Sequence, residues 1–223
     1  MIKTTGTETQ DWVSFFRTSE RNVFYQSIGN RRLIELIFEN TPKGGRVMEA
    51  GCGTALLSFI LADCGYRLTA VDLTEEVIDY AKKRLAVNHP RVELRTGDIL
   101  KLAELFEENH FDVVCSSGVM EHFSDEDIVK SLSEQRRIAK KVIFNVPNIR
   151  TKPTDKHIGD ERFLSNRKWL SLIERAGFKK VKVFGGYDLP VWMYFVLPGA
   201  FFNRRASFWW KYFSMHSIFL CEQ

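Results

Sequence analysis

Two closely spaced glycines and two acids in this sequence have the types and spacing of a ligand site. Gly51 and Gly53 follow an apolar segment at 46–50, and Glu49 precedes the first of them by two residues. Glycine allows a tight turn and a close approach of the backbone to a ligand. Asp72 ends the next strand-like segment, where a carboxylate can accept hydrogen bonds from both hydroxyls of a ribose. The spacing predicts a nucleoside site at the carboxyl edge of a parallel sheet.

The same loop favours a cationic nucleoside over a dinucleotide. The dinucleotide fingerprint G-x-G-x-x-G fails, because its third glycine is replaced by Leu56. An acid at Glu49 would repel a pyrophosphate, so a nicotinamide oxidoreductase is the weaker interpretation. S-adenosylmethionine carries a sulfonium and an ammonium and no phosphate, which suits a mildly acidic loop. A plain strand-turn-helix without a ligand is the structural alternative, and the register of Glu49 with Asp72 argues against it.

Several motifs resemble those of class I S-adenosylmethionine-dependent methyltransferases, in their small-molecule, type-11-like branch. The run from Glu49 to Ala55 is similar to the first motif, E/D-x-G-x-G-x-G, with Ala55 in place of the last glycine, a mild departure because that position starts the helix. Further similar stretches are Thr96–Ile99 after a third strand, Phe111–Phe123 over a fourth strand and its loop, and Gly177–Phe178 before a late strand. The resemblance covers about residues 40–184 and a last strand near 217–221.

This resemblance implies S-adenosylmethionine as the cofactor and S-adenosylhomocysteine as its product. The implied binding residues are Glu49, Gly51, Cys52, Gly53, Asp72, Leu73, Asp98, Ile99, Ser116 and Tyr25. In this family pattern Asp98 would accept a hydrogen bond from the adenine amino group, and the Ile99 backbone would meet the ring. Tyr25 would reach the methionine carboxylate, although such a ring is more often part of the core.

The elements that must position these residues alternate between strand and helix. Strands are expected at 46–50, 67–72, 92–95, 111–116, 142–146, 181–184 and 217–221, and helices within 8–40, 54–64, 74–87, 99–108, 125–140 and 166–176. This order predicts an α/β fold with a mainly parallel sheet. The resemblance adds that the sheet is Rossmann-like and seven-stranded, flanked by helices, with the last strand antiparallel. The 223 residues would form one domain: an N-terminal helical cap (1–40), a cofactor-binding core (41–184), an aromatic insertion (185–216) and the last strand (217–223).

Two histidines are candidates for acid–base chemistry. Methyl transfer mainly requires an acceptor held in line, and a base is needed only if the acceptor must lose a proton. His122 follows the fourth predicted strand, and histidine side chains titrate near neutral pH. The alternative is that His122 only fixes its loop.

His157 and Asp160 belong to a polar loop after the fifth predicted strand, His157–Phe163, that could close over the acceptor. In the competing interpretation, Arg162 pairs with a carboxylate and a cap on the next helix holds the loop. No metal site is expected, because no second histidine is near and the four cysteines form no CxxC pair.

Aromatic residues are concentrated near the end of the chain. Residues 187–213 hold 11 of the 29 aromatics, among them Trp192 and Tyr194, with basic residues interspersed. This segment would first of all form an apolar wall for the acceptor, and Trp192 and Tyr194 are the predicted contacts. Peripheral membrane contact and a dimer contact are the alternatives, which leaves monomer and homodimer both open.

The charge distribution and the length of the apolar segments limit which further partners are expected. The net charge is +4, but residues 130–182 carry 15 Lys/Arg against 5 Asp/Glu, a net of +10. A solvated helical surface explains this better than nucleic acid does, since no RNA-binding module is visible. We see no secretory signal, and the apolar run at 189–202 is too short and proline-interrupted to span a membrane, so a cytoplasmic enzyme is expected.

Together these patterns predict an S-adenosylmethionine-dependent methyltransferase acting on a small, apolar or amphipathic acceptor. The rival interpretations are a methyltransferase acting on RNA or protein, and a module that binds the cofactor without transferring its methyl group.

Overall fold

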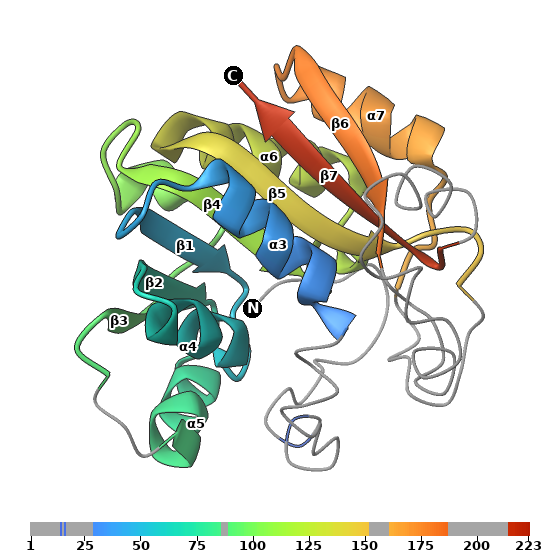
Figure 1. Ribbon diagram of the computed structural model, residues 1–223. Helices are drawn as coiled ribbons and strands as arrows, with labels where there is room; N and C mark the ends of the chain where they lie inside the picture. The colour runs from blue at the N-terminus through green and yellow to red at the C-terminus, as the bar shows by residue number, and fades with distance from the viewer. Residues whose placement is uncertain (1–13, 15, 17–28, 86–88, 152–160, 187–213) are drawn as a thin grey trace, which may run out of the picture.

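The computed structural model describes residues 14, 16, 29–85, 89–151, 161–186 and 214–223, which fold around a seven-stranded sheet (Figure 1). Its strands are β1 (Arg46–Ala50), β2 (Arg67–Asp72), β3 (Val92–Thr96), β4 (Phe111–Ser117), β5 (Ala139–Pro147), β6 (Lys180–Gly185) and β7 (His216–Glu222). They lie in the order β3-β2-β1-β4-β5-β7-β6. β1 to β5 pair in parallel, and β7 runs antiparallel to both of its neighbours. The predicted α/β fold with an antiparallel last strand is confirmed.

Helices cover both faces of this sheet. α3 (Arg31–Asn40), α4 (Leu56–Asp63) and α5 (Glu75–Leu85) pack on one face, and α6 (Asp125–Ile138) and α7 (Asn166–Arg175) on the other. Figure 1 shows α3 crossing in front of β4 and β5, with α6 and α7 behind. Fully buried side chains fill both layers, such as Leu33 of α3 on the first and Trp169 of α7 on the second. Each strand of the sheet centre therefore buries both of its faces.

Several element boundaries agree closely with those expected from the alternation of strands and helices. β1 and β2 begin and end at the residues expected, and β6 and β7 extend the expected strands by one residue at each end. α6 begins at Asp125 because Ser124 caps it, accepting a hydrogen bond from the Asp127 amide at 3.1 Å. It ends at Ile138, two residues earlier than expected, because β5 already begins at Ala139.

One predicted helix is wrong. The segment 99–108 contains only a short 3₁₀ turn at Leu102–Glu104. The Leu100 amide donates to Asp98 Oδ1 at 2.8 Å, and the Ala103 amide donates to Glu134 of α6 at 2.7 Å. Because these amides bond to side chains, a regular i→i−4 ladder does not form over this segment.

Basic side chains of the segment 130–182 take part in ion pairs with nearby acids. Arg137 pairs with Glu108 at 3.2 Å, and Lys140 pairs with Asp112 at 2.7 Å. Burial raises the pKa of Asp112, but the hydrogen bonds from Lys140 and the Arg46 amide outweigh it and leave this pKa below its usual value. Part of the positive charge of this segment is thus paired with acids within the fold.

Parts of the predicted domain division fall outside the described residues. Most of the N-terminal cap (1–40) and most of the aromatic insertion (185–216) lie there, so these boundaries stay predictions. Within the part of the chain that is described, no helix combines the length and the apolar character needed to cross a membrane.

Candidate active site

The glycine loop after β1 is anchored to the end of β2. The amides of Gly51 and Cys52 both donate to the Val71 carbonyl, at 2.8 and 2.9 Å. Gly51 and Gly53 have φ angles of +73° and +50°, in the left-handed region that glycine adopts without strain. Both glycines are therefore required by the backbone of the loop.

Side chains from two distant segments pack against these glycines. A Cβ placed on Gly51 would lie 2.7 Å from the Val119 side chain, which belongs to the loop after β4. A Cβ on Gly53 would lie 2.6 Å from the ring of Phe16. Val119 and Phe16 thus approach the glycine loop as closely as glycine permits. Sequence reasoning placed neither contact.

The residue that replaces the motif's last glycine is also left-handed. Ala55 is the N-cap of α4, with φ 55° and ψ 19°. The sequence interpretation treats this substitution as mild because the helix starts there. The structure corrects that interpretation, because an alanine in this conformation carries backbone strain of about 1–2 kcal/mol.

Glu49 is buried at the end of β1 and holds the start of α4. It is 6% exposed, and its Oε2 accepts hydrogen bonds from the Ser58 amide at 3.0 Å and the Ser58 hydroxyl at 2.6 Å. Burial is the main cause that raises the pKa of Glu49 to about 7, and the charge of Asp72 also raises it. The two hydrogen bonds from Ser58 lower this pKa but do not outweigh burial. This carboxyl group can therefore change its charge near neutral pH.

Asp72 ties β2 to the glycine loop. Its Oδ2 accepts from the Gly53 amide at 2.9 Å, and its Oδ1 accepts from the Thr74 amide at 3.2 Å. Burial raises the pKa of Asp72, while the backbone amides of Gly53, Thr74 and Leu73 act in the opposite direction. Each carboxylate oxygen keeps a further lone pair that could accept from a ligand hydroxyl.

The end of β3 lies beside the end of β2. The Gly97 amide donates to the Asp72 carbonyl at 2.8 Å, which places the predicted adenine-binding residues Asp98 and Ile99 next to the ribose-binding acid. Asp98 is partly exposed, whereas Ile99 is buried. The structure thus brings the three predicted acids to the ends of three neighbouring strands.

The other predicted cofactor residues differ in their position in the fold and in their burial. Cys52 is buried in the glycine loop, and its burial raises the pKa of the thiol well above the usual value. Leu73 follows β2 and is partly buried. Ser116 is 2% exposed inside β4, opposite Phe144 of β5. Tyr25 lies outside the described residues.

The turn after β4 places an acid next to the predicted histidine. Met120–His122 form a 3₁₀ turn, in which His122 is partly buried and Glu121 is 4% exposed. Burial raises the pKa of Glu121 to about 7. Sequence reasoning selected His122 and passed over Glu121, although an acid after a buried strand was the available signal.

Most of the predicted acceptor-side residues cannot be placed. His157, Asp160, Trp192 and Tyr194 all lie outside the described residues, so their roles stay predictions.

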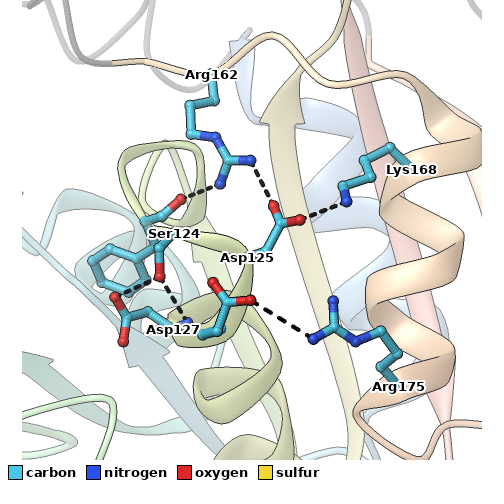
Figure 2. Close-up of polar contacts among 8 residues, drawn as sticks. Ser124, Asp125, Asp127, Arg162, Lys168 and Arg175 are labelled. Atoms are coloured by element: carbon cyan, nitrogen blue, oxygen red, sulfur yellow. Dashed lines mark hydrogen bonds and ion pairs between the residues drawn. The ribbon is translucent and has the colours of Figure 1, made fainter. Parts of the chain in front are cut away.

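The polar loop before α7 is described from Glu161 onward, and Figure 2 shows how it is held. The Arg162 guanidinium donates to the Phe123 carbonyl and to Asp125, which also pairs with Lys168. Ser165 caps α7 by accepting from the Lys168 amide at 3.2 Å. The Arg162–carboxylate pair and the helix cap of the competing interpretation are both present, and the acceptor-side role of His157 and Asp160 stays a prediction.

Three further polar side chains meet between β4, β5 and α3. The Asn145 side-chain amide donates to the Ser117 hydroxyl at 3.3 Å, and that hydroxyl donates to Asn30 Oδ1 at 3.0 Å. Sequence reasoning assigned no role to Asn145, although an amide among apolar strand residues was the available signal. In the described part of the chain, no group of three or more metal-ligating side chains converges.

The residues at this edge fit a nucleoside with positive charges. The left-handed glycines bring the backbone close to the place of a ligand, and Asp72 can accept from ribose hydroxyls. When it is ionised, Glu49 adds a negative charge beside the loop, which favours a ligand that carries a sulfonium and an ammonium.

The sheet order, the antiparallel β7 and this glycine loop define a Rossmann-like methyltransferase fold. A family model described as a methyltransferase domain matches residues 47–141, which run from β1 into β5. The matched family model and the fold imply S-adenosylmethionine as the cofactor.

Two curated relatives are similar to part of this chain. A ubiquinone biosynthesis O-methyltransferase of Coxiella burnetii is 30% identical over 109 residues, which are 48% of this chain and 46% of that protein. A magnesium-protoporphyrin O-methyltransferase of Rhodobacter capsulatus is 34% identical over 105 residues, 46% of this chain and 45% of that protein. The chain thus matches about half the length of these relatives.

Among solved structures, a TehB-like S-adenosylmethionine-dependent methyltransferase from Corynebacterium glutamicum has a similar fold. Its TM-score is 0.61 with 20% sequence identity, and the alignment covers 94% of this chain and 97% of that one. This likeness concerns the fold alone.

Proposed function

We propose that this protein is an S-adenosylmethionine-dependent O-methyltransferase that acts on a small, apolar or amphipathic acceptor. The observation that carries the proposal is the bond from the Gly53 amide to Asp72, which joins the glycine loop to the acid in the family's ribose position. The two curated relatives support the O-methyl transfer, since both are named as O-methyltransferases of small molecules.

The cofactor would be held along the ends of β1, β2 and β3. Asp72 would accept from the ribose hydroxyls, Asp98 from the adenine amino group, and Glu49 would offset the positive charges of the methionine part. The bound cofactor supplies a methyl group that is already activated. The chain's own residues then have to hold the acceptor in line and exclude water.

A nucleic-acid acceptor has less support. The segment 130–182 motivates it, but Arg137, Lys140 and other basic side chains of that segment pair with acids within the fold. Binding to bulk RNA that weakened steeply with salt would favour this alternative. Peripheral membrane contact, a dimer contact and a cytoplasmic location stay predictions.

Calorimetric titration with S-adenosylhomocysteine tests the proposal. We expect binding by the wild type, and Asp72→Ala should weaken it about 10- to 100-fold, because hydrogen bonds to a charged group are lost. Asp79→Ala is the matched control, since Asp79 is an exposed acid of α5. A folded wild-type protein that bound neither S-adenosylmethionine nor S-adenosylhomocysteine would exclude the function. Equal affinities of wild type and Asp72→Ala would remove the ribose role.

A cofactor-binding module without transferase activity is the remaining alternative. It would bind S-adenosylhomocysteine as tightly as expected but release none from S-adenosylmethionine with any acceptor in a broad screen of small hydroxyl compounds.

A further inference from the structure

Two buried oxygen atoms beside the turn after β4 have no hydrogen-bond donor in the part of the chain that the structure describes. They are Oε2 of Glu121 and Oδ1 of Asn145. A buried acceptor atom without a donor costs about 1–3 kcal/mol, so native proteins rarely keep one without a reason. Two such atoms at the edge that carries the glycine loop indicate a place where a ligand supplies the donors.

The backbone brings the two side chains to the same turn. The Gly118 amide donates to the Asn145 carbonyl at 3.1 Å, and a Cβ on Gly118 would lie 3.6 Å from Glu121 Oε1. Val119, the next residue, packs against Gly51 of the glycine loop. Glu121 and Asn145 are therefore neighbours of the turn that touches the proposed cofactor loop.

Asn145 is oriented by its own hydrogen bonds. Its amide nitrogen faces the Ser117 hydroxyl, which is in turn fixed by Asn30 at the start of α3. With the nitrogen engaged, the side-chain oxygen is the atom left for a ligand, and it can only accept. The partner of Asn145 must therefore be a donor, such as a hydroxyl.

The groups around Glu121 allow it to hold and release a proton. His122 lies on its own turn, His216 on β7 and Glu161 before α7. Burial is the main cause that raises its pKa to about 7, the two histidines lower it and Glu161 raises it. The guanidinium of Arg162, the nearby cation of the loop before α7, is directed to Phe123 and Asp125 instead.

Resting on the proposed function, we propose that Glu121 and Asn145 bind the methyl acceptor through two hydroxyl groups, and that Glu121 is the base for the hydroxyl that becomes methylated. The proton of that hydroxyl passes to Glu121 Oε2. The hydroxyl oxygen uses a lone pair to form the new bond to the methyl carbon. The carbon–sulfur bond breaks, and its electron pair stays on sulfur, which becomes the neutral thioether of S-adenosylhomocysteine.

This assignment selects a class of acceptor. A neutral compound with two hydroxyl donors, such as an alkylated catechol, satisfies both free oxygens. A carboxylate would bring no donor and would be repelled by Glu121 and Glu161. An apolar substituent on the ring fits the amphipathic acceptor of the proposed function.

The test uses 4-tert-butylcatechol as the probe, with 4-tert-butylphenol as the single-hydroxyl comparison. Binding is measured by calorimetry on protein saturated with S-adenosylhomocysteine, and turnover by release of S-adenosylhomocysteine from S-adenosylmethionine. We expect the catechol to bind more tightly than the phenol. Asn145→Ala should reduce this ratio of affinities about 10-fold. In turnover, the variant should raise KM for the catechol more than it lowers kcat.

Glu121→Gln keeps the shape of the side chain and cannot accept the proton. We expect kcat to fall about 100-fold or more, with S-adenosylhomocysteine affinity unchanged. In the wild type kcat/KM should rise with pH through about 7, where the base loses its proton, and this limb should vanish in the variant. Glu121→Asp, which keeps a carboxyl group, should restore part of the rate and the limb. Glu107→Gln, at an exposed acid, is the matched control.

The outcomes separate this inference from the proposed function. A wild type that fails to bind S-adenosylhomocysteine refutes both. A wild type that binds S-adenosylhomocysteine refutes this inference alone if it neither binds nor methylates the catechol, or if Glu121→Gln keeps the rate and the pH profile.

Discussion

The two halves of the sheet's carboxyl edge, which we name the cofactor half and the acceptor half after the roles proposed above, differ in how their acidic and amide side chains are hydrogen-bonded. In the cofactor half, at the ends of β1, β2 and β3, Glu49, Asp72 and Asp98 each accept a hydrogen bond from a backbone amide. In the acceptor half, at the ends of β4 and β5 and the start of β7, Glu121 and Asn145 each keep a buried oxygen without a donor among the described residues.

This difference shows in which half the described residues satisfy one another's hydrogen-bonding groups. Carboxylates that bond to loop amides fix the loop before any ligand arrives. Buried acceptors that no described residue satisfies leave hydrogen-bonding capacity that a ligand can fill. The cofactor half therefore has the character of a preformed scaffold, and the acceptor half that of a site which its ligand completes.

The largest expected effect concerns the pH dependence of stability. Glu49 and Glu121 both have a folded-state pKa of about 7, against an ordinary value of 4.5. Between these values the folded state keeps a proton that the unfolded state has released. Stability is therefore lost as pH rises through this window, by on the order of 3 kcal/mol for each group. Glu49→Gln and Glu121→Gln should each reduce this loss.

Urea unfolding at about pH 5 and about pH 8 measures the effect. At the higher pH, Glu121→Gln should stabilise the protein more than Glu49→Gln, because the Glu49 carboxylate has the two bonds from Ser58. Glu107→Gln should leave the pH dependence unchanged, since Glu107 is exposed. If both buried variants behave alike, the contrast between the halves is wrong.

A smaller effect is expected at the ion pairs that hold the acceptor half. Asp125→Asn removes the charge that pairs with Arg162 and Lys168, and should lower the free energy of unfolding by about 1 kcal/mol near neutral pH. These partners lower the pKa of Asp125. Its contribution is therefore present above the unfolded-state pKa and is lost as pH falls below it, so the two proteins should converge in acid.

Glu126→Gln is the matched control for Asp125→Asn. Glu126 lies on the same helical turn, but it is largely exposed and 4.0 Å from Arg175. Urea unfolding should detect little change in this variant. Equal losses in both variants would contradict a specific role for the Asp125 ion pairs.

The smallest effect is expected in the glycine loop. Ala55→Gly relieves the backbone strain at φ 55°. It also removes a buried methyl group and increases the conformational entropy of the unfolded chain. These terms nearly cancel, so the free energy of unfolding should change by less than about 1 kcal/mol. A large loss in urea unfolding would show that the methyl group matters more than the backbone.

The cofactor half could be predicted from sequence because its features are local. Gly51, Gly53 and Asp72 follow strands whose apolar runs mark their own ends, and a parallel sheet brings such ends to one edge. Ala55 was misjudged because its conformation depends on the turn and not on the helix that follows.

The acceptor half was harder because its features are tertiary. The pKa of Glu121 responds to the charges of His216 and Glu161, which are distant in sequence, and the orientation of Asn145 depends on Asn30 at the start of α3. The wrong helix at 99–108 has the same cause, since Glu134 of α6 takes the Ala103 amide.

The position of β7 has a consequence for how the chain acquires its shape. β7 lies between β5 and β6, and in the described part of the chain β6 pairs only with β7. During synthesis, β1 to β5 can associate as they emerge, but β6 has no neighbour until residues 216–222 have been made. Completion of the sheet therefore depends on late, non-local pairing, which is slow compared with the formation of local contacts. Until then β6 and one edge of β5 are open to pairing with other chains.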